Sequence, residues 1–117
     1  MSRLRHAFVA ALALTGTVHG AVKAPGPTDA TSTHTRDWAC IRWFESRDNY
    51  RSHSNEPFTG AYQIANFVWH ATLRLPGQAW QFSNHVQNRA ALRLWHYDLR
   101  TWGNPWRAWE TAPLCGL

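Results

Sequence analysis

The first apolar segment of the chain predicts a helix with one buried face. Trp38, Ile41 and Glu45 fall at positions i, i+3 and i+7, so they lie on the same side of a helix. The helix is expected to begin within residues 35–37, where a Thr or an Asp can cap it, and to end near Ser46. The pattern therefore places a carboxylate on an apolar face.

The middle of the chain predicts a loop, a hairpin and a short helix. Residues 47–57 are rich in Asn, Ser, Asp and Arg, which is typical of a loop. Residues 58–64 predict a strand or hairpin arm that turns at Gly60. A second helix is expected over 66–73, because the Leu-Pro-Gly sequence that starts at residue 75 stops helices.

The longest helix is expected from a cap at Ser83 to about Leu99. Its apolar stripe steps by four, four and three residues along one face and consists of Val86, Ala90, Leu94 and Tyr97. Residues 102–105 predict a turn, and residues 106–110 a last helical turn. The fold class is therefore α+β, mainly helical, with a very small sheet.

The N-terminal residues have the pattern of a secretory signal. Arg3, Arg5 and His6 precede an apolar run over residues 7–18 that is too short to span a bilayer. Cleavage is expected after Gly20, with Ala24 as an alternative site. This divides the chain into a signal peptide (1–20), a flexible linker (21–36) and one folded domain (37–117), and it predicts a secreted protein.

Export changes the interpretation of the two cysteines, Cys40 and Cys115. An oxidising compartment favours a disulfide between them, which would close most of the domain into one loop. The chain-entropy relation gives such a bridge about 4 to 5 kcal/mol. The alternative, a nucleophilic cysteine, lacks a histidine in any recognisable partnering motif.

The charge argues against nucleic acid as a partner. The whole chain carries +5, and ten Lys/Arg against seven Asp/Glu leave +3 over residues 21–117. These cations form no run, whereas nucleic-acid binding needs a clustered basic surface. A mild positive charge suits attraction to an anionic polymer such as a bacterial wall.

His85 and His96 are too far apart to share a metal ion, so neither a metal nor another cofactor is expected.

Glu45 is the candidate for chemistry. Cleavage of a glycosidic bond needs a proton donor at the leaving oxygen. Burial of a glutamate against aromatic rings raises its pKa toward neutrality, and Trp38, Trp43 and Phe44 lie within two turns of Glu45. The eight tryptophans can stack on sugar rings or fill the core. Trp38, Trp43 and Trp95 are assigned to the core or its rim, whereas Trp69, Trp102 and Trp106 are candidates for a cleft.

Four motifs, in order, resemble one family of wall-cleaving enzymes. The motifs are Glu45-Ser46 with Asn49, then 60–64 (Gly-Ala-Tyr-Gln-Ile), then Val68-Trp69, and last the tryptophan-rich segment that ends at Cys115. With them the chain resembles the resuscitation-promoting-factor or transglycosylase-like domain of actinobacteria. That family belongs to the lysozyme-like superfamily. The resemblance covers residues 38–115 and implies a small lysozyme-like domain with a short β-hairpin and one disulfide.

The resemblance also implies roles for individual residues. Glu45 would be the catalytic acid, and the family's disulfide would correspond to Cys40 and Cys115. The substrate-binding residues would be Asn49, Tyr62, Gln63 and Trp69. Asn49 would brace the loop after the acid, Gln63 would line the cleft floor, and Trp69 would shape the sugar site.

Three positions depart from the family pattern. Phe44 stands where the family usually has its first cysteine, and Cys40 lies one helical turn earlier on nearly the same face. Arg47 and Asp48 replace two glycines, which adopt backbone angles that are costly for other residues. Val68 replaces a common Thr and removes a hydroxyl.

The hairpin has no acid that could act as a second catalytic carboxylate. Asp48 and Glu56 are the nearest candidates, and both are better explained as charges on the surface of a loop. A single Glu favours a lytic transglycosylase over a hydrolase.

The expected function is thus cleavage of the β-1,4 bond between N-acetylmuramic acid and N-acetylglucosamine by a secreted, wall-associated monomer. Its partner is the peptidoglycan glycan strand, with no stable membrane insertion after signal cleavage. The alternative is a non-catalytic wall-binding or signalling module with the same fold, or a disulfide-containing secreted protein with an unrelated partner.

Overall fold

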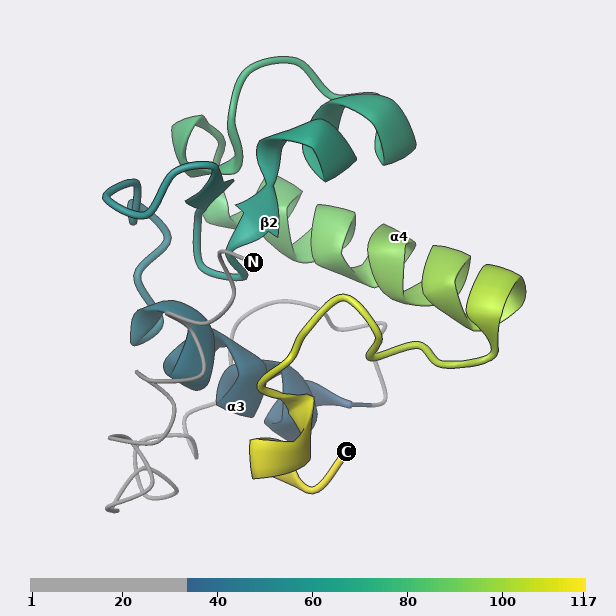
Figure 1. Cartoon of the computed structure of the whole chain (residues 1–117). Helices are drawn as coiled ribbons and strands as arrows, with labels where there is room; N and C mark the ends of the chain where they lie inside the picture. The colour runs from purple at the N-terminus through teal and green to yellow at the C-terminus, as the bar shows by residue number, and fades with distance from the viewer. Residues whose placement is uncertain (1–33) are drawn as a thin grey trace.

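The computed structural model of the chain describes residues 34–117 (Figure 1). The expected signal peptide and most of the expected linker lie outside these residues. The elements, in chain order, are α3 (Thr35–Ser46), β1 (Phe58–Thr59), β2 (Ile64–Ala65), η1 (Val68–Thr72), η2 (Ala79–Gln81), α4 (Asn84–Trp102) and η3 (Ala112–Cys115). The described part is therefore mainly helical with one small antiparallel sheet, as the sequence predicts.

Helix α3 has the buried face that its spacing predicts. Trp38, Ile41 and Glu45 are 3%, 0% and 6% exposed. The cap differs from the prediction, because His34 is the N-cap residue and its side chain forms no capping hydrogen bond. His34 Nδ1 instead lies 3.3 Å from Asp37 Oδ2 in the first turn. An acidic residue near the positive end of the helix dipole also stabilises this end.

The hairpin turns at Gly60, a position where no side chain fits. In the two-stranded sheet Phe58 pairs with Ala65 and Thr59 with Ile64. Gly60 has φ +81°, and a Cβ at this position would lie 2.5 Å from Oε1 of Gln87. That oxygen accepts a hydrogen bond from the Ala61 backbone N–H at 3.0 Å. The close approach of α4 to the turn therefore requires glycine.

The second predicted helix forms, but most of it is a π-helical turn. Residues 66 and 67 are α-helical, and η1 follows with a hydrogen bond from Leu73 N–H to Val68 O at 3.0 Å. The turn ends at Leu73, ahead of Pro76, as predicted. The Trp69 indole Nε1 donates to Pro76 O at 2.9 Å and joins the turn to the segment that follows it.

Helix α4 begins where the sequence predicts and ends three residues later. The Ser83 side chain accepts a hydrogen bond from Val86 N–H, and Gly103 (φ +76°) ends the helix. The predicted stripe is wrong at its last position, because Tyr97 is 39% exposed and Asp98 is 3% exposed. The buried positions also include Gln87 and Ala91, so the inner face is rotated by about one residue.

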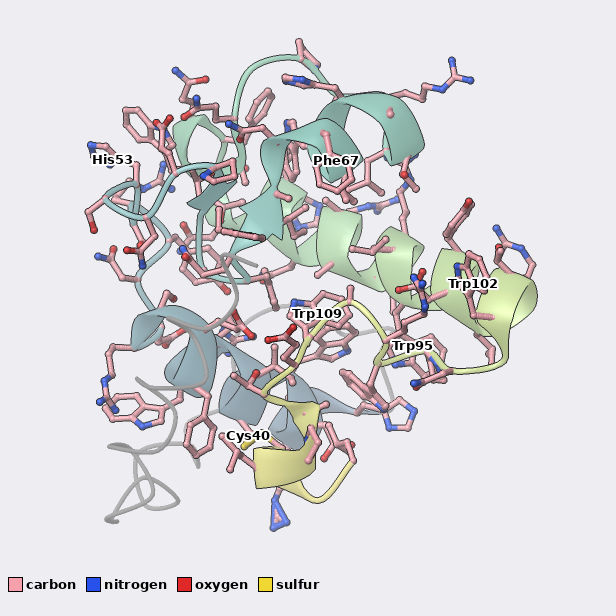
Figure 2. All side chains as sticks on the ribbon, in the orientation of Figure 1. Cys40, His53, Phe67, Trp95, Trp102 and Trp109 are labelled. Carbon is pink, nitrogen blue, oxygen red and sulfur yellow. A yellow bond between two sulfur atoms is a disulfide. The ribbon has the colours of Figure 1, made fainter. Side chains whose placement is uncertain are left out.

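The C-terminal segment returns from α4 to α3, where a disulfide holds it (Figures 1 and 2). The helical turn expected over 106–110 does not form, because residues 105–108 make a hydrogen-bonded turn and the helical turn is η3. Cys40 and Cys115 are bonded with Cα atoms 5.9 Å apart, which confirms the predicted bridge. None of the helices within residues 34–117 is long and apolar enough to cross a membrane.

Candidate functional site

Glu45 lies in the last turn of α3 and faces the C-terminal segment. Its side chain is 6% exposed, and Oε2 accepts a hydrogen bond from Thr111 Oγ1 at 2.7 Å. Thr111 directly precedes η3, which carries Cys115. The disulfide and this hydrogen bond therefore join the same two segments, the first in the middle of α3 and the second in its last turn.

The loop after Glu45 is held by side chains where the resembling family has glycines. Arg47 and Asp48 have φ values of +59° and +62°, a conformation that costs most residues about 1–2 kcal/mol. The backbone N–H groups of both residues donate to Arg42 O, and that of Arg47 donates also to Trp43 O. The Arg47 guanidinium lies 5.0 Å from the Trp43 ring centroid. The left-handed turn is thus compatible with these two residues.

Arg42 connects this loop to the hairpin. It is 3% exposed, its Nε donates to Asp48 Oδ1 at 2.7 Å, and its Nη1 donates to the Tyr62 hydroxyl at 3.0 Å. The guanidinium also lies 5.8 and 5.7 Å from the ring centroids of Tyr50 and Tyr62. Because Arg42 precedes Glu45 by less than one turn, this network fixes the position of the helix end that carries the acid.

Two tyrosines complete the network as neutral phenols. The hydroxyls of Tyr50 and Tyr62 both donate to Asn88 Oδ1 on α4, the first at 2.7 Å. Burial raises the pKa of both phenols, so both stay protonated at neutral pH. Tyr62 is 2% exposed, and its hydroxyl is engaged by Arg42 and Asn88. In this structure Tyr62 supports the site from inside.

Gln63 and Asn49 both brace backbone. Gln63 has φ +50° and is 3% exposed, and its Nε2 donates to Gly60 O at 3.0 Å and Ser52 Oγ at 3.2 Å. Asn49 is exposed, and its Oδ1 accepts from Arg51 N–H at 2.9 Å. Asn49 N–H also donates to Ser46 Oγ, whose hydroxyl donates to Ala61 O at 2.8 Å. The loop after the acid is therefore bonded to the hairpin.

The expectation that Trp69 faces a cleft is wrong in this structure. Its side chain is 0% exposed, and its ring packs against Phe82 with centroids 5.5 Å apart. Trp38 is buried as predicted, and Trp43 and Trp95 are half-buried. Of the proposed cleft candidates, Trp102 is 56% exposed and Trp106 is half-buried.

A groove lies between η1, α4 and the segment that follows α4. We call it the acidic groove; it has a volume of about 510 Å³, and its lining includes Phe67, Tyr97, Asp98, Trp102, Arg107 and Glu110. Phe67 and Trp102, labelled in Figure 2, are 70% and 56% exposed. A cavity of about 20 Å³ lined by Gln63 and Trp109 shares Val68, Leu94 and Ala108 with it. This small cavity thus borders both the groove and the hairpin.

The sequence pattern does not predict most of the groove. Tyr97 falls on the predicted core stripe, and Asp98, Arg107 and Glu110 have no predicted role. A signal was present at Asp98, because it follows Leu94 by four residues on the inner face of α4. Its charge is what made it an unlikely core residue.

The other charged candidates are accounted for. Asp48 is ion-paired with Arg42, and Glu56 is exposed in the loop before Pro57. Within residues 34–117, the structure contains no group of three His, Cys, Asp or Glu side chains that could hold a metal ion. No family model, curated protein or solved structure matches the chain. The assignment of function therefore depends on the geometry of this site and on the motif order.

Proposed function

We propose that the protein is a peptidoglycan-cleaving enzyme that acts on the β-1,4 bond between N-acetylmuramic acid and N-acetylglucosamine with Glu45 as its acid. The observation that carries the proposal is the position of Glu45. Glu45 is 6% exposed and lies at the end of α3, and its carboxylate accepts a hydrogen bond from Thr111 at 2.7 Å. A rigidly held, desolvated carboxyl group is what general acid catalysis at a glycosidic oxygen needs.

The surrounding framework supports the proposal, because it restricts the motion of the acid. The disulfide, the Arg42 network and the hydrogen bond from Ser46 to the hairpin all act within one turn or two of Glu45. Such fixed positioning of a reacting group contributes to catalysis independently of its acidity.

A single acid favours the lytic transglycosylase reaction. Glu45 gives its proton to the glycosidic oxygen, and the bond from that oxygen to C1 of the muramic acid breaks. The hydroxyl at C6 of the same sugar then bonds to C1 and returns its proton to Glu45, so that a 1,6-anhydro end forms and no water is consumed. The nearest loop carboxylates are engaged by Arg42 or exposed, and neither is placed to act as a nucleophile.

The test compares the full chain with Glu45→Gln on purified peptidoglycan, with products identified by mass spectrometry. We expect Glu45→Gln to lower the rate by at least about 100-fold. The matched control is Asp37→Asn on the same helix, which should retain activity. Anhydro ends would select the transglycosylase, whereas reducing ends would select a hydrolase. Activity that survives Glu45→Gln would refute the assignment.

The second candidate is a wall-binding module without turnover. It is favoured by the limited exposure of Glu45 and by Arg47 and Asp48, which fill the turn where the resembling family has glycines. Peptidoglycan binding by the wild type, without products and with equal binding by Glu45→Gln, would select this candidate.

A further inference from the structure

The acidic groove contains a buried carboxylate that lacks part of its bonding. Asp98 is 3% exposed and lines the groove. The carboxylate accepts a hydrogen bond from the Ala108 backbone, but Oδ2 has no partner among the described residues. Burial of an unsatisfied acceptor costs about 1–3 kcal/mol. A ligand that donates to this oxygen would recover that free energy.

The groove also carries a net negative charge. Glu110 is exposed on its lining, and Arg107 is the cation there. The Arg107 guanidinium lies 4.2 Å from the Trp102 ring centroid, and it forms no ion pair within 4.0 Å of Asp98 in the described part of the chain. The two carboxylates thus exceed the one cation, and the cation is held against an aromatic ring.

A basic hollow lies directly beside the groove. It has a volume of about 330 Å³, is lined by Arg93, His96 and Arg100, and shares Thr72 and Tyr97 with the acidic groove. Arg93, His96 and Arg100 fall at i, i+3 and i+7 on α4, whereas Asp98 lies on the other side of Tyr97. The Arg100 side chain is exposed and makes no hydrogen bond or ion pair with another residue of the segment 34–117. Opposite charges therefore flank Tyr97.

We propose that the two hollows together bind a short zwitterionic peptide across Tyr97, with a primary ammonium group at Asp98 and a carboxylate at Arg100. Charge complementarity carries the proposal, because the acidic groove attracts the ammonium group of such a peptide and the basic hollow attracts its carboxylate. The exposed rings of Phe67 and Tyr97 provide an apolar surface for the carbon chain between the two charges.

A neutral sugar fits the same surface less well. A hydroxyl could donate to Asp98 but would leave the carboxylate charge uncompensated. The Trp102 ring already has Arg107 on one face, which reduces the aromatic surface that a sugar could stack on. Arg93, His96 and Arg100 would also have no anion to bind in an uncharged glycan.

Peptides with free amino and carboxyl groups are attached to the glycan of peptidoglycan, so the groove would hold the peptide of the polymer that Glu45 cleaves. That connection rests on the proposed function, whereas the binding does not. A binding measurement consequently separates failure of this proposal from failure of the glycosidase assignment.

The test uses the full chain and N-acetyl-Ala-Lys-Ala, whose lysine ammonium and terminal carboxylate are its only charges. Binding is measured by calorimetry, and the matched probes carry an acetylated lysine or an amidated C-terminus. We expect each modification to weaken binding about tenfold. An N-acetylglucosamine tetramer serves as the glycan probe.

Two variants locate the ends of the peptide. Asp98→Asn should weaken binding of the free-lysine probe about tenfold and leave binding of the acetylated probe unchanged. Arg100→Gln should weaken binding of the probe with a free carboxylate about tenfold and leave binding of the amidated probe unchanged. Asp37→Asn and Arg89→Gln, both outside the groove, serve as controls and should bind as the wild type does. If Asp98→Asn fails to fold, Arg100→Gln and the modified probes on the wild type still decide the outcome. No binding of the tripeptide at millimolar concentration, equal binding of all three peptides, or binding of the tetramer alone would overturn the proposal.

Discussion

The buried charged side chains of α3 have partners, whereas along α4 a buried carboxylate keeps an oxygen without one. Arg42 is matched by Asp48 and Tyr62, and Glu45 is matched by Thr111. Asp98 has the Ala108 backbone for one oxygen and no described partner for the other. Arg42, Glu45 and Asp98 are buried to a similar degree, so the two regions differ in how completely these charged groups are hydrogen-bonded.

The difference shows where binding is to be expected. Paired charged groups stabilise one conformation and hold their side chains in place. An unsatisfied group lowers stability, and a binding partner can recover that loss. The α3 region is therefore suited to hold a catalytic group in place, and the groove along α4 is suited to take up a ligand.

Loss of the disulfide should break the α3 region most severely. The bridge spans 75 residues, so Cys40→Ala with Cys115→Ala should lower the free energy of unfolding by about 4 to 5 kcal/mol. Urea denaturation measures this, and dithiothreitol acting on the wild type should reproduce it. An unchanged midpoint after reduction would show that the bridge contributes nothing.

Gly60→Ala should separate the hairpin from α4. The new Cβ would lie 2.5 Å from Gln87 Oε1 at a residue with φ +81°, so both strain and the lost bond to Ala61 contribute. We expect a loss of about 3 kcal/mol in the free energy of unfolding. Gly103→Ala is the matched control, because its φ is +76° but no atom lies within 4 Å, and it should lose only about 1–2 kcal/mol. Equal losses would mean that the contact with Gln87 is unimportant.

Asp48→Asn should leave the buried Arg42 without its carboxylate. Asparagine tolerates the left-handed backbone, so the change isolates the charge. We expect a loss of about 2 kcal/mol, less than for a fully buried pair because the Asp48 side chain is 52% exposed. The loss should shrink in 1 M salt, and Glu56→Gln, at an exposed carboxylate of the following loop, provides the control. A change within 0.5 kcal/mol would show that the Arg42 network does not depend on Asp48.

The sequence predicted the α3 region better than the groove, for a physical reason. Trp38, Ile41 and Glu45 are spaced at a helical period, so the sequence alone predicts that they share one face of α3, and all three are buried. On α4, a stripe ending at Tyr97 and one ending at Asp98 differ by a rotation of about 100°. Hydropathy favours Tyr97, whereas the hydrogen bond from the Ala108 backbone to Asp98 joins residues that only the folded chain brings together. The π-helical form of η1 likewise has no local sequence signal.

The smallest effect, and the one that tests the groove most directly, should come from Asp98→Asn. Burial raises the pKa of Asp98 above its ordinary value of 3.8, against the opposing effects of Arg107 and the Ala108 hydrogen bond. Between the unfolded and folded pKa values the folded state binds more protons, so this carboxyl group lowers stability as the pH rises through that range. Asp98→Asn should therefore become more stable than the wild type, by under about 1 kcal/mol, only above that range.

Urea denaturation of both proteins between pH 3.5 and 8 measures the difference, which should be smallest at the acidic end. If the difference grows toward acid instead, a further partner stabilises Asp98 in its charged form. The lysine tripeptide supplies the complementary measurement at neutral pH. A ligand stabilises the state that it binds, so it should raise the unfolding midpoint of the wild type more than that of Asp98→Asn. Equal shifts would place the ammonium group elsewhere, and the Asp98 carboxylate would then be a buried charge that serves only the fold.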